Sequence, residues 1–142
     1  MEENTKYKGQ ITEQKCYLKC LEHGYIVSRP IFDSARYDFI LDTGKKLLRI
    51  QVKTSTWVDA EHTIFSFNGY SQHNIGAGTK RMLYTNKEID YFMTEKQGTY
   101  YLYPANEIGF TQKKLRLSSK QSAQPSIIWA EDYQFEKVCE TF

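Results

Sequence analysis

Hydrophobic and polar residues alternate through residues 36–53, which read RYDFILDTGKKLLRIQVK. Two β-rich runs flank a Thr-Gly-Lys turn signal, a pattern typical of an antiparallel hairpin. Because successive side chains of a strand point to opposite faces, a turn centred on residues 44–45 places Asp38 across from Gln51. Lys53 lies one pleat further along the same face. The pattern therefore predicts a patch that gathers a carboxylate, an amide oxygen and a lysine.

Such a patch suits a hard divalent cation. Mg²⁺ prefers oxygen ligands and keeps several waters, so one carboxylate, one neutral carbonyl oxygen and a substrate phosphate can hold it. A lysine beside the metal can orient or deprotonate the attacking water and balance charge on a phosphate. The alternative is an ordinary solvated strand, because a Glu/Gln-x-Lys tripeptide occurs roughly once in a chain of this length at average composition. The spacing alone leaves both open.

The first helix is expected at about residues 6–23, with Gly24 as its C-terminal stop. At about 100° per residue, one broad apolar arc is expected to face the core, formed by Ile11, Cys16, Tyr17, Leu18, Cys20 and Leu21. Glu13 falls inside this arc, where a carboxylate is costly unless it is paired or binds a cation. The alternative is that the first turn overhangs the core and Glu13 reaches water. A strand at residues 25–31 should follow, with Pro30 at an edge or an end.

Several elements are expected after the hairpin. Residues 62–68 and 99–103 read as strands. Residues 85–92 are expected to form a short helix opened by a capping box, and residues 69–81 a polar, glycine-rich loop. A final amphipathic helix is expected to pack on the core or on a second subunit. Together these elements predict an α/β fold, with a mixed β-sheet of about five strands flanked by helices.

Polar and basic side chains suited to DNA gather in two segments. The first supplies candidates for base edges and phosphates, namely Gln72, His73, Asn74, Lys80 and Arg81. The second is a basic strand or ribbon that carries Lys113, Lys114, Arg116 and Lys120. Ser55, at a polar strand end, is a further candidate for a phosphate contact. The alternatives are a mobile loop for the first segment and an edge strand kept soluble by lysines for the second.

Composition indicates one globular domain over residues 1–142, since 40% of the residues are hydrophobic. We expect its core at about 6–104, and 105–142 to provide a basic strand and a C-terminal helix for DNA contact or oligomerisation. A net charge of +2 neither requires nor excludes nucleic acid. The apolar runs are too short to span a bilayer and no signal region is visible, so we expect an intracellular protein without a membrane partner. The three cysteines suit reduced thiols.

The order of Glu13, a strand, Asp38 and then Gln51-Val52-Lys53 resembles the core of the PD-(D/E)XK nucleases. The similarity covers roughly residues 6–55 and continues more loosely through YTNKEIDYF and YYLYP to LRL. Within that superfamily the chain looks most like the homing endonucleases of group I introns. It is more distantly similar to archaeal Holliday junction resolvases.

The resemblance implies a role for each of these residues. Asp38, Gln51, Glu13 and the main-chain carbonyl of Val52 would bind Mg²⁺, for which Mn²⁺ can substitute, and Lys53 would serve the attacking water. Two departures are visible, because no proline precedes Asp38 and Gln51 replaces the usual acid. The intron-encoded branch is known for this glutamine, which sharpens the subfamily match. Glu13 must then supply the missing negative charge.

The implied function is a Mg²⁺-dependent, site-specific endonuclease of the intron-homing type that hydrolyses both strands of double-stranded DNA. One chain carries one site, so we expect a homodimer or a homotetramer. One rival is a junction-resolving nuclease, and another is a DNA-binding module that has lost catalysis through Gln51. Glu13, Asp38 and Lys53 together argue against the binding module, which has no need of an inward carboxylate beside a lysine.

Overall fold

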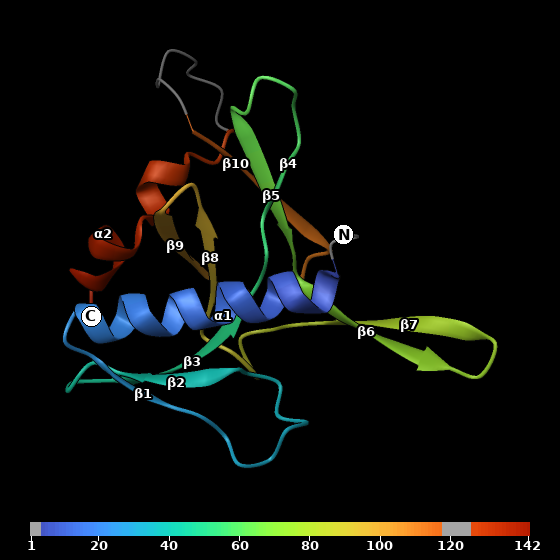
Figure 1. Cartoon of the computed structure of the whole chain (residues 1–142), viewed down its shortest axis with the longest axis horizontal. Helices are drawn as coiled ribbons and strands as arrows, with labels where there is room; N and C mark the ends of the chain where they lie inside the picture. Colours follow the sequence, from blue (N-terminus) through green and yellow to red (C-terminus); the bar gives the residue numbers. More distant parts are fainter. Residues whose placement is uncertain (1–3, 118–125) are drawn as a thin grey trace.

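The computed structural model describes residues 4–117 and 126–142. Its helix α1 (Thr5–Glu22) crosses one face of a five-stranded sheet (Figure 1). The strands of this sheet, in spatial order, are β1 (Ile26–Ser28), β2 (Phe39–Asp42), β3 (Leu47–Val52), β8 (Tyr91–Lys96) and β9 (Thr99–Pro104). β3 and β8 are parallel and the other neighbours antiparallel, so the expected α/β fold with a mixed sheet of about five strands is confirmed.

Two smaller sheets complete the strands. One has the order β10 (Gln112–Arg116), β5 (Ile64–Asn68) and β4 (Thr56–Trp57). The other is a two-stranded hairpin of β6 (Tyr70–Ile75) and β7 (Gly78–Leu83), which projects away from the remainder of the molecule (Figure 1). The chain ends in a 3₁₀ turn, η1 (Ala130–Tyr133), and a short helix, α2 (Phe135–Cys139).

Two hydrophobic clusters cover the two faces of the main sheet. On the α1 side, the Tyr17 ring meets the edge of Phe39 at 5.1 Å between centroids. On the other side, Phe67 of β5 packs against Phe92 of β8 at 5.4 Å. Phe92 and Met93 are neighbours on β8 and belong to opposite clusters, as strand alternation requires. Phe135 of α2 is fully buried in the first cluster, so the final helix packs on the core of its own chain.

The apolar arc expected on the first helix is wrong in part. Only Cys16, Tyr17 and Cys20 are buried, whereas Ile11, Leu18 and Leu21 are 42%, 57% and 54% exposed. The physical reason is that the apolar residues of α1 occupy two separate faces of the helix, and the sheet covers one of them. The prediction of one broad arc combined these two faces into one.

Two local predictions are also wrong. The expected 69–81 loop is the β6–β7 hairpin, whose two-residue connection is opened by Gly76 at φ +51°. The expected helix at 85–92 is one turn, in which the Thr85 carbonyl accepts hydrogen bonds from the amides of Glu88 and Ile89. The chain then enters β8, because Asp90 N–H donates to the Arg49 carbonyl at 2.8 Å and begins the parallel pairing with β3. Long-range pairing thus overrides the local capping signal.

Cys16, Cys20 and Cys139 are buried and form no disulfide. Within the described residues, no helix is long and apolar enough to cross a membrane.

Candidate functional site

The β2–β3 hairpin sets the geometry of the candidate site. Its register pairs Phe39 with Ile50, which places Asp38 opposite Gln51. Asp38 N–H donates to the Ile50 carbonyl at 2.8 Å, and Val52 N–H donates to the Asp38 carboxylate at 2.7 Å. The connection runs through Gly44 at φ +85°, a conformation that glycine adopts without steric cost. The juxtaposition of Asp38 and Gln51 expected from alternation is confirmed.

Gln51 is buried, with 9% of its surface exposed. Its amide nitrogen lies 3.3 Å from the Val52 carbonyl oxygen and donates to it. The Asp38 carboxylate accepts a hydrogen bond from the Val52 N–H, so the side chains of Asp38 and Gln51 both contact the main chain of Val52. A carboxylate, an amide and a main-chain carbonyl therefore converge at the end of β3.

Glu13 approaches the same region from α1. It is half-buried, and its carboxylate accepts a hydrogen bond from the Tyr17 hydroxyl. Burial and the Glu13 carboxylate raise the pKa of Tyr17 above its ordinary value, so the hydroxyl stays a donor. Tyr17 was expected only in the core, and its contact with Glu13 follows from their separation of four residues on one helix.

Burial shifts the pKa values of the two central charged groups, Asp38 and Lys53, in opposite directions. Burial raises the pKa of Asp38 to about 6, the Glu13 charge adds to the rise, and the Val52 N–H and Lys53 oppose it. Burial lowers the pKa of Lys53 to about 8, with Arg36 adding to the fall and Asp38 opposing it. Both groups therefore titrate near neutral pH, as is common at catalytic sites.

Lys53 joins this site to the projecting hairpin. Its Nζ donates to the Tyr70 carbonyl at 2.7 Å and lies 5.0 Å from the centre of the Tyr84 ring. Its main-chain N–H donates to the Met93 carbonyl at 2.9 Å, which extends the pairing of β3 with β8. The lysine is thus fixed at both ends, by the main sheet and by the base of β6.

Arg36 is a second link to the hairpin, and the sequence did not single it out. Its guanidinium stacks on the Tyr84 ring at 3.8 Å and donates to Glu88 at 2.7 Å and to Ser71. It also donates to the carbonyls of Met82 and Leu83, at 3.1 and 3.0 Å. The available signal was its position two residues before Asp38, which puts it on the same strand face. Its partners come from far along the chain.

A family model described as PD-(D/E)XK endonuclease matches residues 3–136. The chain belongs to the PD-(D/E)XK endonuclease family. Among solved structures it is similar to a bacterial homing endonuclease, I-Ssp6803I, with a TM-score of 0.76 over 97% of this chain and 93% of that one. Sequence identity is 21%, so this likeness concerns the fold. No curated protein matched the chain.

PD-(D/E)XK nucleases generally use divalent metal ions, and the donor atoms of this chain fit one. Asp38 offers carboxylate oxygens, Gln51 its amide oxygen and Val52 its carbonyl oxygen, which here accepts from the Gln51 amide nitrogen, and oxygen ligands are those that a hard cation prefers. Burial and, to a smaller extent, the Glu13 charge raise the pKa of Asp38, and a bound cation would favour its ionised form. The described residues hold no cluster of three His, Cys, Asp or Glu side chains, so a metal here depends on the amide and the carbonyl.

The β6–β7 hairpin of this nuclease carries five of the residues expected to contact DNA. Gln72 pairs with Arg81 and Asn74 with Thr79 on one face, while His73 pairs with Lys80 on the other. All are exposed. The Arg81 guanidinium lies 4.4 Å over the Tyr70 ring at the base of the hairpin. The structure therefore gathers these residues on one narrow ribbon, with the candidates divided between its faces.

The remaining candidates for DNA contact lie elsewhere. Ser55 is only 7% exposed and its hydroxyl donates to the Glu95 carbonyl at 2.7 Å, so that group is committed inside the fold. Lys114 is exposed on β10, whereas Lys113 lies 4.8 Å over the Phe110 ring. Arg116 ends this strand, and Lys120 lies outside the described residues.

The raised pKa of Asp38 yields a stability prediction. Folded Asp38 titrates near 6 against an ordinary 3.8, so its contribution to stability is lost as pH rises from about 4 to about 6. Asp38→Asn keeps an acceptor for the Val52 N–H. Because asparagine does not ionise, the variant should not lose stability over this pH range. At pH 7 in EDTA it should have a higher melting temperature than the parent and a free energy of unfolding larger by on the order of 1 kcal/mol, after discounting for the half-buried position.

Melting curves of both proteins from pH 4 to 8 test this. The advantage of Asp38→Asn should grow up to pH 6 and then level off. Asp33→Asn, which changes an exposed aspartate, serves as the control. An advantage independent of pH would contradict the assigned charge state of Asp38.

Proposed function

We propose that this chain is a metal-dependent, site-specific DNA endonuclease of the homing type. Asp38, Gln51, Glu13 and the Val52 carbonyl would form the metal site, and Lys53 would act on the attacking water. The observation that carries the proposal is the convergence of Asp38 and Gln51 on Val52, next to a lysine whose pKa is lowered to about 8. Family membership supplies the reaction class, hydrolysis of a phosphodiester bond.

A bound Mg²⁺, or Mn²⁺ in its place, would supply positive charge for the scissile phosphate and lower the pKa of a coordinated water. Lys53 can donate or accept a proton near the working pH, because its pKa lies close to 8. Its hydrogen bond to the Tyr70 carbonyl fixes the ammonium at the base of β6, and the Asp38 charge acts on its pKa. Glu13 provides the second negative charge that the neutral Gln51 lacks.

Double-stranded DNA is the proposed substrate, with the β6–β7 hairpin as its reading element. A two-stranded ribbon fits the major groove, where Gln72, His73 and Asn74 can bond to base edges. Lys80 and Arg81 can hold phosphates on either side. The base of this ribbon is tied to the site through Lys53 and Arg36, which supports coupling between reading and cutting. Lys113, Lys114, Arg116 and Lys120 are proposed as backbone contacts.

Cutting both strands requires two sites, so we propose that a homodimer or a homotetramer acts on DNA inside the cell. A module that only binds DNA gains nothing from half-burying Asp38 and Lys53 with their pKa values displaced, since both shifts cost stability at neutral pH. A junction-resolving nuclease would share the chemistry but has less use for a ribbon of exposed amide side chains.

Mapping the ends produced from a randomised duplex library tests the proposed function. With Mg²⁺ we expect cuts in both strands at one recurring sequence, and none with EDTA. A synthetic four-way junction in the same assay should be cut no faster than a duplex bearing the recovered site. Preferential cutting of the junction would support the resolvase, and binding without cutting would support the inactive module.

Glu13→Gln tests the least conventional member of the site. The change keeps size and hydrogen bonding but removes a negative charge, so cleavage of the recovered site should fall by roughly 100-fold or more. Stability should hold or rise, because repulsion with Asp38 is relieved. Glu107→Gln, in an exposed loop, is the matched control and should cut normally. An active Glu13→Gln protein would remove Glu13 from the site.

A further inference from the structure

Helix α1 carries an apolar stripe that its own chain leaves uncovered. Tyr7 is 67% exposed, and the stripe continues through Ile11, Gln14, Leu18 and Leu21, at alternating steps of four and three residues. We call these five residues the outer stripe. Steps of four and three keep side chains on one line along a helix, the arrangement by which paired helices meet. Four of its five members are large apolar residues, and a contiguous exposed apolar patch of this kind is typical of an interaction site.

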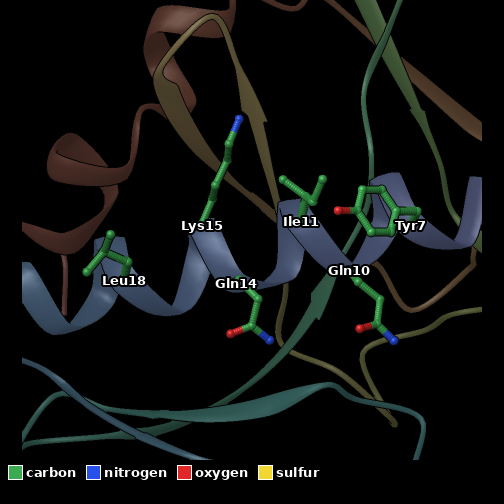
Figure 2. A pocket seen from close by; sticks show the side chains of 6 residues that line it. All are labelled: Tyr7, Gln10, Ile11, Gln14, Lys15 and Leu18. Atoms are coloured by element: carbon green, nitrogen blue, oxygen red, sulfur yellow. The ribbon is translucent and has the colours of Figure 1, made fainter. Parts of the chain in front are cut away.

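The surface of the outer stripe is hollowed. An open depression of about 430 Å³ is lined by residues of α1, with Tyr7, Ile11 and Lys15 along one edge, Gln10 and Gln14 along the other and Leu18 at one end (Figure 2). These residues form two overlapping sets at positions i, i+3, i+4 and i+7, one beginning at Tyr7 and the next at Ile11. Four residues so spaced form the hole that receives one side chain of a facing helix. The depression therefore consists of two adjoining holes.

We propose that the outer stripe pairs with the same stripe of a second copy of this chain, with the two α1 helices antiparallel. The stripe is nearly symmetric about Gln14, with apolar members three and seven residues before it and four and seven after it. With the two-fold axis near Gln14, Leu18 of each copy enters one hole of the other copy. That hole is formed by Tyr7, Gln10, Ile11 and Gln14. Gln14 of each copy then enters the hole that begins at Ile11, where the two amides can bond to each other.

Charges on the flank of the stripe favour the antiparallel arrangement. Lys8 lies near the start of α1 and Glu22 at its end, on the same side of the outer stripe. Antiparallel pairing sets Lys8 of one copy near Glu22 of the other, whereas parallel pairing leaves these two residues on opposite sides of the seam. Lys15, between them, is paired with Glu95 at 3.2 Å within its own chain. That ion pair reduces the repulsion between the two copies of Lys15 near the axis.

The pairing has a consequence for the arrangement of two sites. Glu13 precedes Gln14 directly but points toward the core side of α1, where it contacts Tyr17. A helix pair centred on Gln14 therefore leaves each Glu13 outside the seam, on the core side of its own helix. The inference rests on the proposed function for the homodimer and deepens it by naming the surface through which two copies meet, which can be tested without metal or DNA.

Sedimentation of the purified chain in EDTA, over a range of concentrations, tests the proposal. The parent should associate, and Leu18→Glu should weaken association by at least about tenfold, since it places a charge in an apolar hole. Leu47→Glu is the matched control, because Leu47 is 69% exposed on a strand and lies outside α1. It should associate as the parent does. A parent that stays monomeric, or a Leu18→Glu protein that associates as tightly as the parent, would overturn the proposal.

Disulfide cross-linking tests the position of the two-fold axis without changing an apolar residue. Gln14→Cys should form an intermolecular disulfide under mild oxidation, because the axis passes near this position, while the three native cysteines are buried. Lys6→Cys, at an exposed position early in α1, should not form one. Equal cross-linking of both variants would overturn the antiparallel arrangement.

Discussion

The hydrogen bond from Val52 N–H to the Asp38 carboxylate is the contact on which the candidate site depends. It reinforces the register of β2 against β3, and that register decides which face receives Gln51 and Lys53. A slip of one residue would turn both side chains to the opposite face. The same contact satisfies one carboxylate oxygen of Asp38 in a half-buried place. Fold and proposed chemistry thus share a single interaction, which ties the activity to the hairpin register.

Gln51 has a physical rationale in this setting. It is 9% exposed and lies beside Asp38, whose pKa is already raised by burial and by Glu13. A third carboxylate there would add repulsion and desolvation in the absence of a metal. A neutral amide keeps an oxygen for a cation without that cost, and Glu13 provides charge from a separate element. In the proposed site, the negative charge would therefore come from α1 as well as from the hairpin, whereas a motif with an acid at position 51 would place it on the hairpin alone.

Local patterns in the sequence predicted the parts of the fold that depend on local chemistry. Alternation around Gly44 located Asp38 opposite Gln51, and helix geometry brought attention to Glu13. The sequence failed where distant pairing decides, as at residues 85–92, where the bond from Asp90 to Arg49 draws the chain into a parallel strand. It also failed to find the contacts of Arg36 with the hairpin, because these partners are brought together only by the assembled sheet. The apolar residues of α1 were assigned to one face because periodicity alone does not distinguish a buried apolar face from an exposed one.

Cleavage and DNA binding of Asp38→Ala, measured on one preparation, test the central claim most directly. Asp38 is proposed as the main charged ligand, whereas affinity for DNA should come from basic and polar residues elsewhere. The account predicts that Mg²⁺-dependent cleavage is lost while DNA binding and the folded structure remain close to the parent's. Cleavage at the parent's rate would contradict it.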